Sequence, residues 1–215
     1  DDILESGFRE ELLNNVLPDW LRQMRWFGAK GREIHHIDLE DKQDIWLDEQ
    51  NRAFWLLIKV NYYYGLPEIY QLPITFTPKE AENDTIKTFP QSRILDITIN
   101  RIPGHLYDAL YDSRLHRRLI TDLAANTGYR KGAKLACNGS PALQAMAGDA
   151  SSLKSRMLAA EQSNTSIAFE DKFYLKIYRK IDYDINPDQE MIRMLTGALS
   201  FPHAPAFLGT VDWIS

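Results

Sequence analysis

The residues between Ile34 and Phe76 constrain the fold most strongly. This stretch consists of short runs rich in Ile, Val, Tyr, Phe and Trp, and turn residues such as DEQN and YGLPE separate the runs. Such side chains suit a pleated surface, and short runs joined by tight turns pair most simply as neighbours. The sequence therefore predicts three or four antiparallel strands. Pro67 and Pro73 are expected at strand ends or edges, because proline cannot donate a sheet hydrogen bond.

A helical pattern precedes these strands. Residues 3–27 carry apolar side chains at helical spacing, and Pro18 interrupts the pattern. Asn15 or Asp19 is expected to cap the part of the helix that follows the proline. GAKGR is expected to end the helix, because Gly28 and Gly31 tolerate the left-handed conformations that a C-cap requires.

The middle of the chain is less regular. Residues 77–92 are polar and predict a surface loop, and residues 93–102 predict a strand. Apolar residues at helical spacing predict a helix over residues 106–126. Residues 127–152 are rich in Gly, Ala and Ser, which favours a connection with one strand.

The last part of the chain has clearer signals. LKSRMLA and TSIAF predict a hairpin around residues 161–164, followed by a strand in DKFYLKIYRKI. Alternation along that strand places Phe173, Leu175 and Ile177 on one face and Tyr174, Lys176 and Tyr178 on the other. NPDQEMIRMLTG predicts a helix with Asn186 at the N-cap and Pro187 at the first helical position. A final strand is expected in the last ten residues.

Composition limits the classes of function. The net charge of −5 argues against a general nucleic-acid binder, and no apolar run is long enough to span a bilayer, so neither partner is expected. Cys137 is the single cysteine, which favours a reducing, cytoplasmic compartment. The chain begins at Asp1 and stops at LGTVDWIS, so we expect a fragment of a longer protein.

Three features of the last part could form a nucleotide site. A polar hairpin, residues 161–166, precedes Lys176 on the strand, and Glu190 follows on the helix. In kinases, a hairpin covers the triphosphate, and a strand lysine held by a helix glutamate contacts its phosphates. Each feature also has an ordinary explanation, since strand lysines are commonly solvated and glutamates are favoured early in helices. The pattern alone favours the ordinary explanation.

Resemblance to a known family favours the nucleotide site over the ordinary explanation. Seven stretches resemble the N-terminal part of the bacterial maltokinases, and they occur in the family's order from residue 25 to 213: RWFGAKGR, YQLPITF, LYDALYDSRLHRRLI, EQSNTSIAF, LKIYRKI, INPDQEMIRMLT and FPHAPAFLGTVDW. EQSNTS and INPDQE are more specific than a loose glycine pattern. The hairpin has no glycine, unlike the Gly-rich loop of protein kinases.

The resemblance implies an α+β fold of two parts. Residues 1–92 would form the maltokinase cap, a curved antiparallel sheet with helices. Residues 93–215 would form an intermediate region and a kinase-like small lobe, an antiparallel sheet with one helix. Within it, Lys176 would contact the ATP phosphates, and Glu190 would orient Lys176. The residues that would cover the triphosphate are Ser163, Asn164, Thr165 and Ser166.

The resemblance also implies an activity, transfer of the ATP γ-phosphoryl group to the anomeric hydroxyl of maltose, giving maltose 1-phosphate. These kinases carry their catalytic aspartate and Mg²⁺ ligands in later HGDxH-type and DFE-type motifs, and neither string occurs here. We therefore expect the catalytic base, the ligands of Mg²⁺ and most of the maltose site to lie in a helical lobe outside this chain. The chain alone is then expected to be inactive.

Two alternatives stay open. The chain could belong to another capped sugar kinase, such as a glucosamine kinase, because acceptor choice lies mainly in the helical lobe. It could instead be a non-catalytic module that docks the kinase onto a fused or separate trehalose synthase, since maltokinases often occur fused behind that enzyme or as free enzymes.

Other residues have structural explanations. His35 and His36 are expected on opposite faces of a strand, which argues against a shared metal site, and no zinc-site spacing occurs in the sequence. Trp26 and Phe27 are expected to pack the first helix against the sheet.

Overall fold

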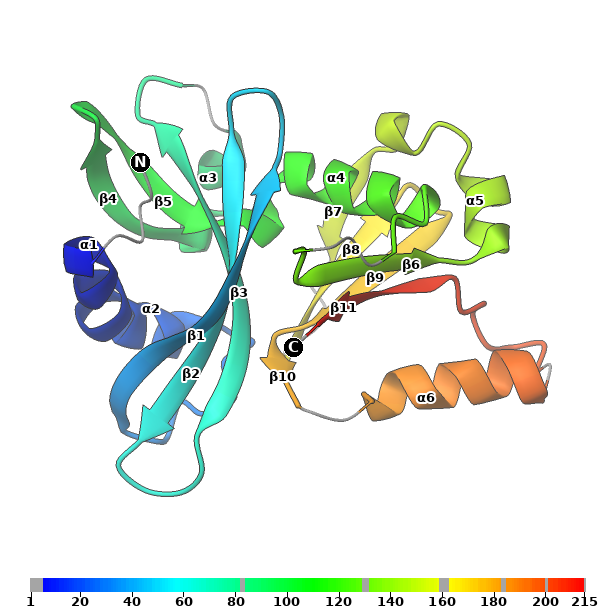
Figure 1. Cartoon of the computed structure of the whole chain (residues 1–215), viewed down its shortest axis with the longest axis horizontal. Coiled ribbons are helices and arrows are strands. Elements are labelled where there is room, and N and C mark those ends of the chain that lie inside the picture. Colours follow the sequence, from blue (N-terminus) through cyan, green and yellow to red (C-terminus); the bar gives the residue numbers. More distant parts are fainter. Residues whose placement is uncertain are drawn as a thin grey trace. The chain divides into compact units, whose positions relative to one another are not determined.

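The fold is α+β, as predicted, and its sheets are antiparallel (Figure 1). The computed structural model describes residues 6–81, 84–128, 132–158, 163–182, 185–199 and 201–214. They divide into two compact units. The first unit comprises residues 1–117 and 153–181, and the second comprises residues 118–152 and 182–215.

The main sheet of the first unit has six strands in the order β1-β2-β3-β5-β4, with β10 paired to β3. The strands are β1 (Ile34–Trp46), β2 (Arg52–Tyr62), β3 (Glu68–Pro78), β4 (Arg93–Ile99), β5 (Ile102–Asp108) and β10 (Lys180–Ile181). The predicted antiparallel strands between residues 34 and 76 are confirmed as three. Two of the predicted runs merge into β1, which is the long edge strand visible in Figure 1.

The prediction for Pro73 is wrong, because this proline lies inside β3, a central strand, opposite Trp55 of β2. On the other side of β3, β10 pairs with residues 69–70 and β5 pairs with residues 74–78. Residue 73 falls between these two partners, so among the described strands none on that side requires its missing N–H. Pro67 immediately precedes β3, as predicted.

The predicted strand over residues 93–102 is confirmed as β4, which ends at Ile99, and the predicted helix over residues 106–126 is confirmed only from Ser113 to Ala124. The chain turns at Asn100 and Arg101, which have φ angles of 51° and 67°, and Ile99 pairs with Ile102 across this two-residue loop. A two-residue hairpin with two positive φ angles matches the twist of its strands. Residues 102–108 are therefore strand β5. The 3₁₀ turn η3 (Ala109–Tyr111) and helix α4 (Ser113–Ala124) follow.

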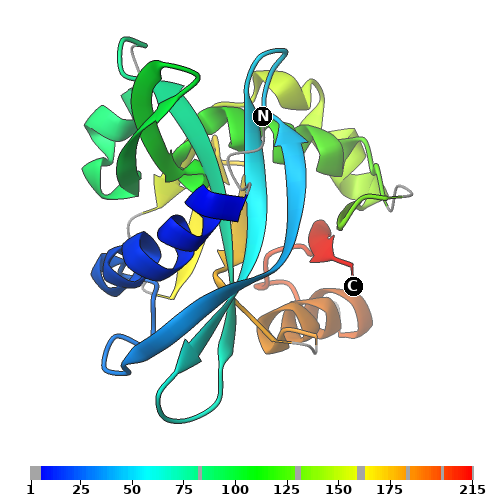
Figure 2. The same ribbon diagram turned by 60° about the vertical axis from the view of Figure 1, so that its left-hand side comes forward.

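The N-terminal segment lies across one face of the main sheet (Figure 2). It consists of α1 (Ser6–Glu11), the π-helical turn η1 (Leu12–Val16) and α2 (Leu17–Gln23). Pro18 lies in the first turn of α2, where its missing N–H is tolerated, so it does not interrupt the helical segment.

The predicted ends of this helix are wrong. The N-cap residue of α2 is Val16 and has no side-chain cap, so neither Asn15 nor Asp19 performs that role. The helix ends at Gln23 with Met24 in an extended conformation, before the predicted stop at Gly28. Packing of the segment against the sheet therefore outweighed the local capping preferences of Asn15, Asp19 and Gly28.

The main core lies between the N-terminal helices and one face of the sheet. Trp26 and Phe27 are buried there and contact the ring of Tyr70, with centroid distances of 6.0 and 5.1 Å. Their predicted packing role is confirmed. The other large side chains of this core include Leu12, Leu17, Trp20, Leu21, Ile37, Phe54, Leu56, Ile58, Leu72, Ile74 and Leu106.

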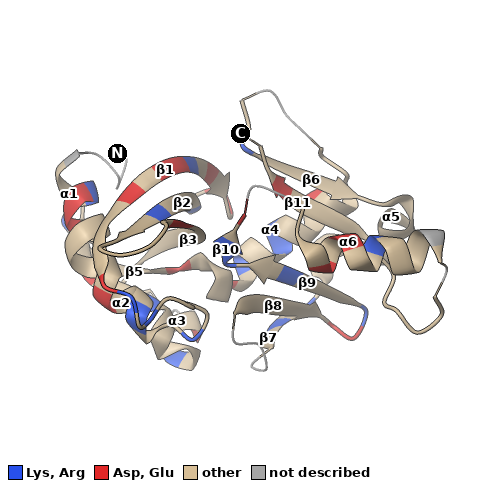
Figure 3. Cartoon of the chain, turned by 90° about the horizontal axis from the view of Figure 1, so that it is seen from below, with Lys and Arg blue, Asp and Glu red and all other residues tan. Residues whose placement is uncertain are grey.

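The edge strand β1 and the connection between β3 and β4 are polar. Acidic and basic residues follow one another along the edge strand β1 (Figure 3), and such charges discourage pairing with another chain. The predicted loop over residues 77–92 contains a short helix, α3 (Asp84–Thr88), and a 3₁₀ turn, η2 (Pro90–Ser92). The loop prediction is therefore only partly correct.

A second sheet of the first unit has three strands, β7 (Ser155–Leu158), β8 (Asn164–Phe169) and β9 (Phe173–Tyr178). β8 pairs antiparallel with both neighbours, which confirms the hairpin predicted from LKSRMLA and TSIAF and the strand after it. Glu161 and Gln162, the start of the predicted polar hairpin, lie outside the described residues.

The second unit contains a two-stranded sheet of β6 (Leu135–Gly139) and β11 (Gly209–Trp213). The single strand predicted within residues 127–152 is confirmed as β6, but α5 (Pro141–Ala147) and the 3₁₀ turn η4 (Ala150–Ser152) were not predicted. The predicted helix is α6 (Pro187–Arg193), which continues into the π-helical turn η5 (Met194–Ala198). Its N-cap prediction is confirmed, since the Asn186 side chain accepts a hydrogen bond from the Asp188 N–H.

The predicted division of the chain after residue 92 stays a prediction. β4 and β5, which follow that position, belong to the same sheet as β1 to β3.

Candidate functional site

The three-stranded sheet β7–β9 presents one face with the predicted cation. Along β9, Phe173 and Ile177 are buried, whereas Tyr174 and Lys176 are exposed, so the predicted alternation is confirmed. Leu158, Ser166 and Lys176 are direct neighbours across the three strands. Side chains of directly paired residues project from the same face of a sheet. The buried Ser166 and the half-buried Leu158 therefore lie on the same face of the sheet as Lys176.

The predicted phosphate-covering residues divide between the two faces. Asn164 pairs with Tyr178 and Ser166 pairs with Lys176, so both lie on the face of Lys176. Thr165 pairs with Ile177 and lies on the opposite face. Ser163 precedes β8 and is exposed.

Lys176 is held near an aromatic ring. Its Nζ atom lies 5.3 Å from the centroid of the Tyr178 ring, close enough for a cation–π interaction. Tyr178 is two residues further along the same face of β9. The Lys176 ammonium group therefore lies toward the Tyr178 end of β9, where Asn164 is the neighbour on β8.

Glu190 lies in the first turn of α6 in the second unit, and its side chain is exposed. Lys176 belongs to the first unit, so the predicted pairing of Lys176 with Glu190 joins residues of the two units and stays a prediction.

A buried charge cluster lies at the C-terminal end of β9. Arg179 and Asp108 are both 0% exposed, and Arg179 Nη2 donates to Asp108 Oδ2 at 2.6 Å. Arg179 Nε donates to Thr165 Oγ1 at 2.8 Å, and the guanidinium carbon lies 4.5 Å from the centroid of the Trp26 ring. This cluster was not predicted from the sequence. Arg179 stands among other basic residues in YRKI, and its carboxylate partner is 71 residues away.

His116 forms a second buried polar contact between the elements of the first unit. Its Nε2 atom lies 2.8 Å from the Leu110 carbonyl oxygen, and its Nδ1 atom lies 2.9 Å from Ser155 Oγ on β7. A neutral ring with its proton on Nε2 satisfies both contacts. Burial lowers the pKa of His116, while the Leu110 carbonyl and the nearby Asp112 and Asp108 carboxylates oppose that shift.

The depressed pKa of His116 predicts a stability that depends on pH. In the unfolded chain, a histidine takes up a proton near its ordinary pKa of about 6.5, whereas the folded state keeps His116 neutral to lower pH. The contribution of His116 is therefore complete above pH ~6.5 and is lost as pH falls toward the depressed folded pKa. We expect the urea midpoint of the wild type to fall more steeply between pH 7 and pH 5 than that of His116→Gln. Equal slopes for the two proteins would contradict this assignment.

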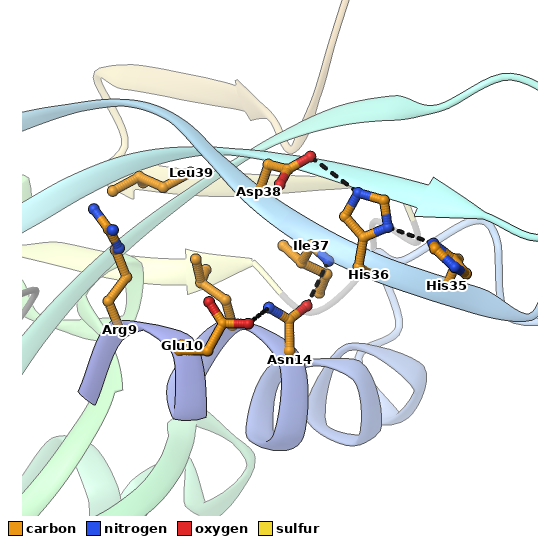
Figure 4. A pocket seen from close by; sticks show the side chains of 9 residues that line it. Arg9, Glu10, Asn14, His35, His36, Ile37, Asp38 and Leu39 are labelled. Carbon is orange, nitrogen blue, oxygen red and sulfur yellow. Dashed lines mark hydrogen bonds and ion pairs between the residues drawn. The ribbon is translucent and has the colours of Figure 1, made fainter. Parts of the chain in front are cut away.

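A polar pocket of about 490 Å³ lies between the α1–η1 segment and β1 (Figure 4). Asn14 connects the two elements, because its Oδ1 atom accepts a hydrogen bond from the Ile37 N–H at 2.8 Å. Its amide also donates to Glu10, so this side chain is fixed within the pocket wall.

The expected separation of His35 and His36 is wrong. Their Nδ1 atoms contact each other in Figure 4, because the pairing of β1 with β2 shifts between Ile34 and His36. Such a bulge inserts an extra residue and brings adjacent side chains to the same side. His36 Nε2 also lies 3.3 Å from Asp38. Among the described residues, however, no group of three or more His, Cys, Asp or Glu side chains could hold a metal ion.

Cys137 is buried in the second unit, and burial raises the pKa of its thiol to about 11, so the thiol is protonated at neutral pH. In the part of the chain that the structure describes, no helix is long and apolar enough to cross a membrane.

Residues 20–112 match the family model of the maltokinase N-terminal cap domain. The matched segment starts in α2, includes strands β1 to β5 and ends after η3. It thus contains Trp26 and Asp108, two of the groups that surround the Arg179 guanidinium.

Proposed function

Residues 20–112 are a maltokinase N-terminal cap domain, which confirms the resemblance of the chain to the N-terminal part of maltokinases, and on this premise we propose that the chain belongs to an ATP:maltose 1-phosphotransferase. The reaction would join the anomeric oxygen of maltose to the γ-phosphorus and break the bond between that phosphorus and the β–γ bridging oxygen. The products would be maltose 1-phosphate and ADP, and the hydroxyl proton would pass to a catalytic base.

The observation that carries the nucleotide part of this proposal is the Lys176 face of the β7–β9 sheet. Lys176 supplies a cation, Ser166 and Asn164 supply polar groups on the same face, and Leu158 supplies apolar surface beside them. Ligand sites commonly combine apolar surface with a few placed polar groups. These residue types support ATP as the proposed donor, which would supply the phosphoryl group.

Each residue would have a distinct role. The Lys176 ammonium would neutralise charge on the α- and β-phosphates, and Glu190 would fix its direction. Ser163, Asn164 and Ser166 would cover the triphosphate with side-chain and backbone donors. Thr165 would contribute its backbone N–H, since its hydroxyl lies on the opposite face and accepts from Arg179.

We propose that the catalytic base, the ligands of Mg²⁺ and most of the maltose site come from sequence outside this chain. The 215 residues contain neither the HGDxH nor the DFE string, and the described residues do not fit a metal site. This chain alone would then be inactive. Because phosphoryl transfer depends on metal and positioned nucleophile together, both must be supplied by the rest of the enzyme.

The proposed partners are ATP, maltose and a trehalose synthase, either as a fused domain or as a separate subunit. The acidic balance and the absence of long apolar runs support an enzyme with no nucleic-acid or membrane partner, and the single cysteine supports a cytoplasmic location.

The test is a transfer assay with the full-length product of the gene that encodes this chain. Purified protein is incubated with MgATP and maltose, and the products are followed by ³¹P NMR and ADP release. We expect a phosphate ester at the anomeric position of maltose and no transfer to glucosamine. Transfer to glucosamine alone would identify a different capped sugar kinase, and the absence of transfer to either sugar would refute both the maltokinase and the glucosamine-kinase assignments.

A further inference from the structure

The buried cluster around Arg179 gives the cap a direct part in the nucleotide site. We propose that Arg179 is a positioning residue, which fixes strands β8 and β9 against Asp108 and Trp26 of the cap and thereby holds the Lys176 face in its nucleotide-binding geometry. This inference rests on the proposed function, because it assigns nucleotide binding to that face.

The side-chain contacts of Arg179 join three elements. Asp108 ends β5, Thr165 belongs to β8, and Trp26 follows α2. The guanidinium group donates to the first two at 2.6 and 2.8 Å and stacks at 4.5 Å over the third. Each contact uses a different part of the planar group, so its position and its orientation are both determined.

The acceptor on the cap side is itself fixed. Asp108 Oδ1 accepts a hydrogen bond from the Leu110 N–H at 3.0 Å, where it caps the 3₁₀ turn η3. The other oxygen of the same carboxylate accepts from Arg179. The ion pair therefore fixes β9 relative to the backbone of the cap rather than to a mobile side chain.

Backbone contacts hold β9 at the same point. The Gln71 N–H on β3 donates to the Arg179 carbonyl oxygen at 2.8 Å, and Gln71 Nε2 donates to the Tyr178 carbonyl oxygen at 2.7 Å. Immediately afterwards, β10 pairs with Tyr70 and Ile69 of β3. Arg179 thus lies where the chain leaves the three-stranded sheet and joins the six-stranded main sheet.

The predicted phosphate contacts are one residue away from this cluster. Thr165 precedes Ser166 on β8, and its partner Ile177 follows Lys176 on β9. A shift of the Thr165–Ile177 pair would therefore displace the Ser166–Lys176 pair. Displacement of reacting groups by about 1 Å can reduce a rate by about 100-fold.

The chemistry of the cluster indicates that Arg179 serves to fix the positions of β8 and β9 and not to raise the free energy of unfolding. A buried ion pair is expensive to desolvate, and an apolar replacement of similar volume is commonly as stable. Within the described residues, Arg179 Nη1 has no hydrogen-bond partner, which is a further penalty. Lysine could retain the charge opposite Asp108 but could not make both directed hydrogen bonds and the planar stack.

The experiment compares four single variants of the full-length protein. Arg179→Lys and Thr165→Val weaken the cluster, and Thr165→Ser restores the hydroxyl that Arg179 requires. Thr75→Val is the matched control, because Thr75 is also a buried threonine of the first unit, with its hydroxyl donating to the Arg52 carbonyl oxygen. The measurements are the ATP dissociation constant by calorimetry, the steady-state constants for ATP and maltose, and the thermal midpoint.

We expect Arg179→Lys to weaken ATP binding by about tenfold, which is less than the ~100-fold loss of rate that a 1 Å misplacement of reacting groups can cause. Thr165→Val should weaken it in the same direction, Thr165→Ser should recover it, and the KM for maltose should not change. Thr75→Val should lower the thermal midpoint without changing ATP affinity.

Two results would overturn the inference in different ways. If Arg179→Lys and Thr165→Val lower the thermal midpoint but bind ATP as well as Thr75→Val does, Arg179 is purely structural and the proposed kinase function is unaffected. If the wild-type protein binds no ATP, the proposed function and this inference both fail. If it binds ATP but phosphorylates neither sugar, only the proposed function fails. A loss of ATP affinity in Arg179→Lys and Thr165→Val would then still support the positioning role of Arg179, and unchanged affinity would still overturn it.

Discussion

Replacing Lys176 by methionine in the full-length protein is expected to reduce kcat/KM for sugar phosphorylation by about 100- to 1,000-fold, the loss typical of removing one group that stabilises transition-state charge. Lys176 is the cation on the face that also carries Asn164 and Ser166. Methionine has a similar length and no charge, so the change removes the ammonium group and little else. The measurement is steady-state ADP release with saturating maltose.

The fold should survive this change, because Lys176 is exposed and its neighbours across the sheet remain in place. Lys172→Met is the matched control. Lys172 lies in the turn before β9, where its Nζ atom pairs with Glu170 at 2.9 Å. It should retain wild-type rates. Full activity of Lys176→Met, with an unchanged thermal midpoint in both variants, would remove Lys176 from the phosphate site.

The second large effect is expected for stability. Replacing Asp108 by alanine should lower the free energy of unfolding by about 3–5 kcal/mol, because the Arg179 guanidinium then stays buried without its counter-ion. Urea unfolding followed by tryptophan fluorescence and circular dichroism measures this loss.

Asp44→Ala provides the control for charge removal at the surface. Asp44 pairs with Arg52 at 3.1 Å, but both side chains are about a third exposed, so the loss should be within about 1 kcal/mol. The double variant Asp108→Ala/Arg179→Met should be more stable than Asp108→Ala alone, because it removes the orphaned charge. A single Asp108→Ala variant as stable as Asp44→Ala would show that the buried pair contributes no more than a surface pair.

Several parts of the fold could be predicted because their signals are local. The apolar period of DKFYLKIYRKI placed Lys176 on one face of β9, and the structure confirms that alternation. The Asn186–Pro187 start of α6 was predicted because an N-cap and its helix are adjacent in the sequence. The match of residues 20–112 to the maltokinase N-terminal cap likewise confirms a resemblance carried by contiguous motifs.

The wrong predictions have a common physical cause, which is that partners distant in sequence overrode local patterns. Leu106 has helical spacing with later leucines, but pairing with β3 and β4 makes it part of a strand. Regular alternation along a strand would separate the side chains of His35 and His36, but the register shift against β2 brings their rings together.

The sequence by itself determined the antiparallel α+β class, the face of β9 that carries Lys176 and the capped helix that carries Glu190, because period and capping act over a few residues. Only the tertiary structure decided that Thr165 turns away from that face and that Arg179 is buried against Asp108 and Trp26. Those contacts depend on how β5, β8 and β9 are brought together. A guanidinium group is exposed or buried according to its neighbours in space, and no neighbour in the sequence specifies them.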